Sequence, residues 1–254
     1  MLNTVSAFAE LAPTQLIVCV GAVFLASLVR GFSGFALSAL IMASLVVFIP
    51  PIHLIPICFL LEATASMVML KGGIKEADMK IVWGLVIGSA IGVPIGLLAT
   101  TSLPVESSKL IALILLILLA LMQLFKVRIA FLATRAGLYI SGLTAGIATG
   151  LASIGGMIVA LYVLSQDRPA RQMRGSLVMF LFLGMFTSLI YLVGYELITM
   201  TALKRAITFA PFVIAGVLIG SWLFKPKWEG FYKRFCLVLL IGLATVSMLR
   251  MMMS

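Results

Sequence analysis

The stretch from Leu16 to Pro50 decides the fold class, and it reads "LIVCVGAVFLASLVRGFSGFALSALIMASLVVFIP". Arg30 is its only charged residue and stands directly before Gly31. About 20 consecutive apolar residues are enough for a helix to cross a hydrocarbon core of roughly 30 Å. The stretch is longer than one crossing needs, and Gly31 and Gly34 divide it. It therefore indicates two membrane segments with a break between them and an arginine beside the break.

The rest of the chain has the same character. Of its 254 residues, 63% are hydrophobic and 10% are charged, whereas a soluble domain is about half apolar and about a quarter charged. We predict an all-α, polytopic membrane protein with eight to ten spans, some of them broken or re-entrant. Lys and Arg lie mostly in short loops, where positive charge determines topology and does not indicate nucleic acid as a partner. Ten apolar segments are expected, approximately at 14–30, 32–50, 54–70, 79–100, 109–125, 132–150, 152–166, 174–194, 203–224 and 233–252.

An internal repeat becomes visible when the two halves are overlaid with an offset of 119 to 124 residues. We predict two transmembrane repeats of about five segments each, residues 1–126 and 127–254, which together form one membrane domain. The alternative is coincidence, because small residues are frequent in membrane helices and let them pack closely. The overlay places Gly31 on Gly150, Gly92 on Gly216 and Gly96 on Gly220.

The loop charges indicate that the second repeat is inverted. In the first half, loops 71–80 and 126–135 are rich in Lys and Arg; in the second half the basic loops are 167–174 and 225–234. The loops at the matching positions of the first half, around 50–53 and 101–109, are not basic. Since basic loops stay in the cytoplasm, each repeat has the opposite orientation to the other. The connection that contains Lys204 and Arg205 fits this scheme only weakly, because it has to lie outside.

Arg30 and Glu62 are the charged residues that the apolar segments of the first half contain at depth. A charge near the bilayer centre costs at least about 2.5 to 3.5 kcal/mol, so such residues usually face a cavity or a partner. Arg30 and Glu62 are each other's most economical partners. Two geometries remain open for Arg30. If segments 14–30 and 32–50 both span, the arginine extends to the cytoplasmic surface; if they form a hairpin, it lies deep.

The glycines beside Arg30 and in a second cluster favour breaks in the backbone. "RGFSGF" (30–35) and "TGLASIGG" (149–156) place Gly and Ser where helices end. A break exposes helix N-termini that attract anions, and at membrane depth it is tolerated only inside protein or beside a wet cavity. Arg174 begins a later segment and is a second basic candidate. The alternative is close helix packing, which we favour for Gly92, Gly96, Gly142, Gly146, Gly216 and Gly220. Further hydrogen-bonding groups in the segment after Arg174 are Ser176, Thr187 and Ser188.

At these residues the sequence resembles the TauE/SafE family of sulfite-exporter-like permeases. The likeness rests on "RGFSGFAL", "PP" and "LLEATAS" in the first half, and on "GLTAGIATGLASIGG" and "RGSL" in the second. The resemblance implies a carrier of small sulfur-containing or carboxylated anions, with a central site where the two breaks meet. The chain departs from the family pattern at Met157, Ala36 and Leu37, which makes a narrower or more apolar cavity expected. The implied substrate-binding residues are Arg30, Gly31, Ser33, Gly34, Glu62, Gly150, Ser153, Gly155, Gly156 and Arg174.

The leading hypothesis is a secondary transporter, or permease, in the cytoplasmic (inner) membrane, with a small anion as substrate. The chain has no GxxxxGK[ST] loop, so a proton or sodium gradient is the energy source we expect. An anion channel and a non-transporting membrane subunit are the alternatives, and a homo-oligomer is compatible with each. An enzyme is not expected, because the spans lack a nucleophile and base constellation. With His53 as the single histidine, neither a metal site nor a cofactor is predicted.

Overall fold

The computed structural model describes residues 2–127, 129–166, 169–223 and 229–253. Over these residues the chain is all-helical and has no strand, which confirms the predicted fold class at that level. Parts of three predicted basic loops, residue 128 and residues 167–168 and 225–228, lie outside the described residues. The helices are α1 (Leu2–Ala9), α2 (Pro13–Ser33), α3 (Leu37–Leu45), α4 (Pro51–Glu76), α5 (Met79–Ser102), α6 (Val105–Leu124), the 3-10 helix η1 (Ala130–Ala133), α7 (Arg135–Ala152), α8 (Gly155–Leu164), α9 (Ala170–Gly194), α10 (Met200–Leu223) and α11 (Glu229–Met253).

Helices α2 to α11 correspond to the ten apolar segments expected from the sequence, whereas α1 and η1 were not expected. Within the described ranges, seven helices are long and apolar enough to cross a membrane: α2, α4, α5, α6, α9, α10 and α11. With 9 and 10 residues, α3 and α8 are too short to cross alone, because a helix rises only about 1.5 Å per residue. The larger number of eight to ten spans therefore stays a prediction.

Two short breaks interrupt the helical chain, one after α2 and one after α7. Helix α2 ends where Gly34 adopts a φ of +82° and donates its N–H to the Arg30 carbonyl. Ser33 stabilises this turn, since its Oγ donates to the Phe35 carbonyl at 2.7 Å. Helix α7 ends where Ser153 adopts a φ of +57° and donates its N–H to the Thr149 carbonyl at 2.8 Å. Both predicted breaks are thus confirmed, and each ends its helix with a residue in the left-handed region.

The two helices on either side of each break form a hairpin. Thr14, near the start of α2, and Pro50, after the end of α3, line one surface cavity. In the second half, the Gln166 side chain after α8 donates to the Leu132 carbonyl before α7 at 3.3 Å. The chain therefore enters and leaves each hairpin on the same side. Segments 14–30 and 32–50 thus fold back on each other, as the hairpin geometry requires, and the depth of Arg30 in the membrane stays a prediction.

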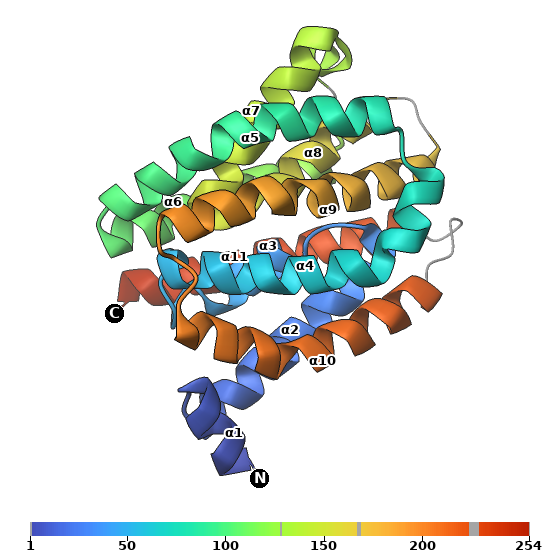
Figure 1. Cartoon of the computed structure of the whole chain (residues 1–254). Helices are drawn as coiled ribbons and strands as arrows, with labels where there is room; N and C mark the ends of the chain where they lie inside the picture. The colour runs from blue at the N-terminus through green and yellow to red at the C-terminus, as the bar shows by residue number, and fades with distance from the viewer. Residues whose placement is uncertain (1, 128, 167–168, 224–228, 254) are drawn as a thin grey trace.

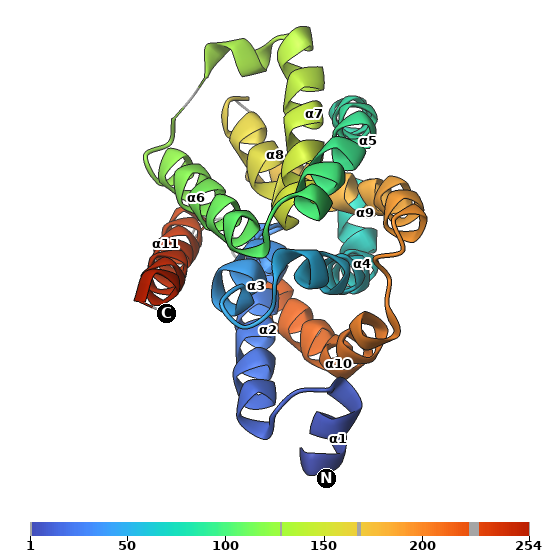
Figure 2. The same cartoon turned by 90° about the vertical axis from the view of Figure 1, so that its left-hand side faces the viewer.

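The long helices pack in matched pairs around these hairpins. Helix α5 packs against α7 at one edge of the bundle, and α10 packs against α2 at the opposite edge (Figure 1). Helix α4 packs against α9 between them, and α6 lies beside α11 on one flank (Figure 2). The two edge pairs approach through glycine: a Cβ on Gly92 would overlap the Leu143 carbonyl, and one on Gly220 would overlap the Leu28 carbonyl. The packing role that we favoured for these glycines is confirmed.

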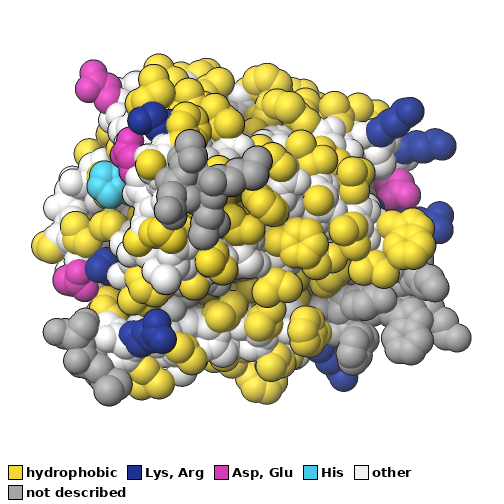
Figure 3. All heavy atoms as spheres, turned by 90° about the horizontal axis from the view of Figure 1, so that it is seen from below, with side chains coloured by type: hydrophobic (Ala, Val, Ile, Leu, Met, Phe, Trp, Pro, Cys, Tyr) yellow, Lys and Arg dark blue, Asp and Glu magenta, His cyan; other side chains and the backbone are white. Residues whose placement is uncertain are grey.

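The surface matches a membrane environment. On the face seen in Figure 3, charged side chains gather at the two ends of the molecule and apolar side chains cover the middle. Lys204 and Arg205, the pair that fitted the charge scheme weakly, bind the end of α1. Lys204 Nζ lies 2.9 Å from Glu10 Oε1, and Arg205 donates to the Ala9 and Glu10 carbonyls at 3.1 Å. The Glu10 carboxylate and the carbonyl groups at the end of α1 therefore account for the positive charge at this position.

Candidate functional site

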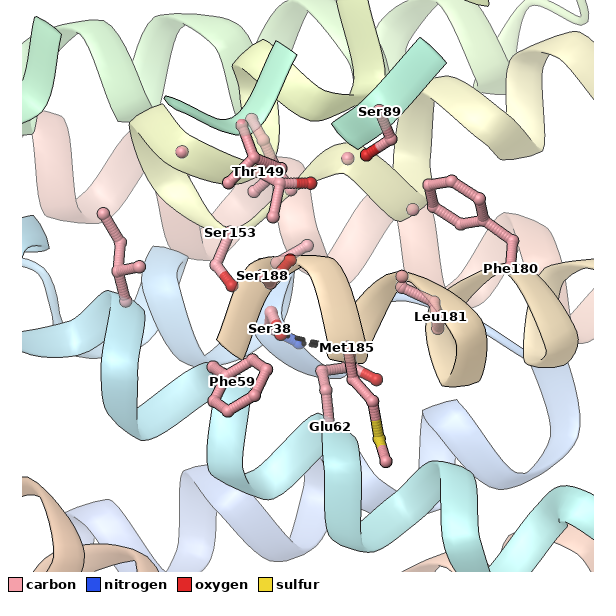
Figure 4. Close-up of a pocket in the computed structure, with 18 of the residues that line it drawn as sticks. Ser38, Phe59, Glu62, Ser89, Thr149, Ser153, Phe180, Leu181, Met185 and Ser188 are labelled. Carbon is pink, nitrogen blue, oxygen red and sulfur yellow. Dashed lines mark hydrogen bonds between the residues drawn. The ribbon is translucent and has the colours of Figure 1, made fainter. Parts of the chain in front are cut away.

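A small cavity lies where the two breaks meet, enclosed by α4, α5 and α9 (Figure 4). Its volume is about 60 Å³, which is room for a few water molecules or one small ion. Much of its wall is apolar, with Phe59 and Phe180 among the lining residues. The polar side chains on the wall are Ser38, Glu62, Ser89, Thr149, Ser153 and Ser188. The cavity therefore combines an apolar enclosure with a ring of hydroxyl groups and one carboxylate.

Arg30 lies behind this wall and is completely buried. Its Nε donates to Glu62 Oε2 at 3.0 Å, and its terminal nitrogens donate to Ser66 Oγ at 3.1 Å and to the Gly34 carbonyl. The guanidinium thus joins the end of α2 to the middle of α4, and it stabilises the break by binding the carbonyl of Gly34. Each nitrogen of the guanidinium faces a protein acceptor. Arg30 can therefore influence a ligand in the cavity only through its ion pair with Glu62.

Glu62 is the charged residue on the cavity wall. Its side chain is 14% exposed, and its Oε1 accepts from the backbone N–H of Ser38 at 3.2 Å and from the Ser38 hydroxyl at 3.1 Å. Ser38 is the second residue of α3, so the carboxylate binds an N–H that the first turn of a helix leaves without an internal acceptor. In Figure 4 Glu62 projects from α4 towards Ser38. The first break is thereby closed by an ion pair and a helix cap.

The second break presents uncharged groups to the same cavity. Gly155 and Gly156 begin α8, and their N–H groups belong to those that a helix start leaves without internal acceptors. Thr149 lies one turn before the break, and its hydroxyl donates to the Ala145 carbonyl of its own helix at 2.8 Å. Ser153 at the break and Ser188 on α9 complete this side of the wall. The second helix start therefore lacks a carboxylate like the one that Glu62 supplies to α3.

Arg174 binds the outside of the first break. One terminal nitrogen donates to the Gly31 carbonyl at 2.5 Å and to Ser221 Oγ at 3.2 Å, and Ser221 donates to the same carbonyl at 3.2 Å. These bonds tie α9 and α10 to the end of α2. Arg174 is half-buried and does not line the cavity. It therefore supports the break without lining the cavity.

The family comparison agrees with this geometry. The family model for sulfite exporter TauE/SafE matches residues 19–248, which is most of the chain. The chain belongs to the TauE/SafE family. It is therefore a membrane protein of a transporter family. No curated protein and no solved structure matches the chain.

The structure brings half of the residues predicted for this TauE/SafE protein to the cavity and places the other half behind it. Glu62, Gly150, Ser153, Gly155 and Gly156 line the cavity. The predicted residues that support the first break from behind are Arg30, Gly31, Ser33, Gly34 and Arg174.

Ser38 and Ser89 were missed as lining residues, and Thr149 was noted only as part of the second glycine cluster. Ser188 was noted as a hydrogen-bonding group and does line the cavity. Ser176 and Thr187 make local bonds elsewhere: Ser176 Oγ accepts from Asp78 N at 3.0 Å, and Thr187 donates to the Gly184 carbonyl at 3.0 Å. Ser38 could have been found from its position four residues after Gly34, at the predicted start of a helix. No comparable sequence signal marks Ser89.

Proposed function

We propose that this TauE/SafE protein is a secondary transporter of a small sulfur-containing or carboxylated anion in the cytoplasmic (inner) membrane. The observation that supports this most is the meeting of two helix starts, those of α3 and α8, at one small cavity. Helix N-termini attract anions through their N–H groups and their dipole. Broken helices at the centre of a membrane domain are the usual site of binding in secondary transporters.

The helix pairs support the proposed inverted repeats, residues 1–126 and 127–254. If α2 to α6 form one repeat and α7 to α11 the other, α5 corresponds to α10 and α2 to α7. Exchange of the two repeats then maps the contact between α5 and α7 onto the contact between α10 and α2. Helix α4 pairs with its own counterpart α9, and α6 with its counterpart α11. Such an exchange is the contact pattern that a two-fold relation between repeats requires. In this proposal the hairpins α2–α3 and α7–α8 are re-entrant and enter from opposite sides.

The position of Glu62 supports coupling of the anion to a cation. An anion in the cavity would meet the Glu62 carboxylate, and two like charges about 4 Å apart repel by about 4 kcal/mol at an effective dielectric constant of 20. A proton or a sodium ion bound at Glu62 removes this repulsion. Arg30 keeps the carboxylate in place until the cation arrives. We therefore propose that Glu62 binds the coupling cation and that Arg30 acts through Glu62.

The proposal is tested with purified protein in proteoliposomes, using radiolabelled sulfite, methanesulfonate and acetate. We expect saturable uptake of at least one anion that increases with a pH or sodium gradient. In Arg30→Gln combined with Glu62→Gln, which removes the carboxylate without leaving a buried guanidinium unpaired, uptake should continue but should no longer respond to the gradient. Glu106→Gln is the matched control, because Glu106 is exposed on α6 and pairs only with Lys109. Uptake that does not saturate would indicate a channel, and no flux of any anion would indicate a non-transporting subunit. Either result contradicts the proposal.

A further inference from the structure

We propose that the site selects a singly charged oxyanion and holds it with the hydroxyl groups of Ser89, Ser153 and Ser188 and the first N–H groups of α8, not with a guanidinium. This inference rests on the proposed transport function and specifies its substrate class. The three serines come from α5, from the second break and from α9, and all three line the cavity (Figure 4).

The serine hydroxyls are the first observation. Ser89 is 4% exposed and Ser188 is 8% exposed, and among the described residues neither hydroxyl has a hydrogen-bond partner. Ser153 is half-buried, and its hydroxyl likewise has no hydrogen-bond partner among the described residues. Buried hydroxyl groups are normally hydrogen-bonded, as that of Ser27 is to the Val23 carbonyl at 2.6 Å. Three hydroxyl groups that face one cavity without protein partners therefore point to a ligand with several acceptor atoms.

The start of α8 is the second observation. The two helix starts at the cavity differ: at α3 the N–H of Ser38 is bound by Glu62, whereas among the described residues no carboxylate accepts a hydrogen bond from the N–H groups of Gly155 and Gly156, which line the same cavity. An oxyanion between Ser153 and Ser188 would supply to α8 the negative oxygen that Glu62 supplies to α3. The hydroxyl groups and the helix start thus line the same cavity.

The charges around the cavity determine the valence of the ligand. Among the described lining residues, Glu62 is the one with a formal charge, and it is negative. Arg30 is completely buried and binds Glu62, Ser66 and the Gly34 carbonyl, while Arg174 binds the Gly31 carbonyl on the far side of the break. Because Arg30 and Glu62 balance each other, one coupling cation bound at Glu62 balances one negative charge on the ligand. A monoanion such as hydrogensulfite, a short sulfonate or a short carboxylate fits this balance, and a dianion such as sulfate does not.

Binding to the detergent-solubilised full chain tests the inference, with methanesulfonate and sulfate as probes in isothermal titration. We expect methanesulfonate to bind and sulfate to bind at least tenfold more weakly. Ser153→Gly and Ser188→Ala should each weaken methanesulfonate binding about tenfold or more, because hydrogen bonds to charged groups are the stronger class. Ser153→Gly removes the hydroxyl without disturbing the break, since glycine accepts the φ of +57° at this position.

Ser141→Ala is the matched control. Ser141 is 2% exposed and its hydroxyl is also buried without a partner, but it lies on α7 away from the cavity. We expect this variant to bind methanesulfonate like the wild type, and thermal unfolding of all variants verifies that they are folded. Unchanged binding in both cavity variants, tighter binding of sulfate, or no binding of methanesulfonate would overturn the inference. If wild-type flux persists while the serine variants bind normally, the transport proposal stands and only the serine site is rejected.

Discussion

The two breaks at the cavity share a backbone design and differ in charge. Thr149 stands four residues before Ser153, as Arg30 stands four residues before Gly34. At the first break the helix end and the next helix start are joined through Arg30 and Glu62. At the second, Thr149 bonds only its own helix. One break is therefore closed by protein groups, whereas the other keeps its N–H and hydroxyl groups available to a ligand.

The ion pair of the first break is better explained by function than by stability. Burial of two charges costs desolvation free energy that their attraction only partly offsets, so a buried pair is weak evidence for stabilisation. Removal of one partner is nevertheless severe, because the other charge stays buried. The first break should therefore be sensitive to any change of charge, and the second should not.

The largest effect is expected for Arg30→Ala. This change leaves the Glu62 carboxylate without its partner in a buried site, which should lower the free energy of unfolding by about 3–5 kcal/mol. Thr149→Ala at the matching position of the second break should have a much smaller effect. The free cysteines Cys19, Cys58 and Cys236 are all buried. A dye that fluoresces when it reacts with exposed thiols therefore reports the unfolding temperature of both variants during heating in detergent.

A double variant separates charge from packing in this test. Arg30→Gln combined with Glu62→Gln removes both charges and should be more stable than Arg30→Ala alone. Equal melting temperatures for Arg30→Ala and Thr149→Ala would show that the two breaks do not differ in the way described. A double variant that is less stable than Arg30→Ala would show that packing, and not the unpaired carboxylate, causes the loss.

An intermediate effect is expected from one glycine at each break. A Cβ on Gly31 would lie 2.5 Å from the Val217 carbonyl and 2.8 Å from Gly220 Cα, so Gly31→Ala must separate α2 from α10. We expect a loss of about 1–3 kcal/mol from this overpacking. A Cβ on Gly156 would meet nothing closer than Leu181 at 3.6 Å, so Gly156→Ala should melt like the wild type while it narrows the cavity and weakens uptake. Equal stability of both variants would contradict the difference in packing.

Much of this organisation was predictable because it depends on local pattern. The apolar segments, the two glycine breaks and the pairing of Arg30 with Glu62 follow from hydropathy, from helix-ending residues and from the cost of an isolated charge in a membrane. The side of the wall on which Arg30 lies was not predictable, since a long side chain can point either into a cavity or towards a carboxylate behind it. Ser89 was missed for a related reason, because a serine in an apolar helix usually bonds its own backbone. Helix α1 was missed because its eight residues form too short an apolar segment to be recognised as a span.

The smallest effect is expected for an exposed ion pair far from both breaks, Glu10 with Lys204. Hydrogen bonds from Lys204 and Thr201 hold the pKa of Glu10 below its usual value of 4.5. A lowered pKa in the folded state means that the contact stabilises the protein above pH 4.5 and that this contribution is lost as the pH falls through the lowered pKa. Glu10→Gln should therefore lower the melting temperature slightly at pH 7, and the difference from the wild type should disappear in acid. Thermal unfolding followed by circular dichroism over this pH range measures the difference in melting temperature. The exposed pair is screened by water, so its removal should cost much less stability than removal of the buried pair. If Glu10→Gln lowered the melting temperature as much as Arg30→Ala does, burial would not be what makes the pair at the first break important.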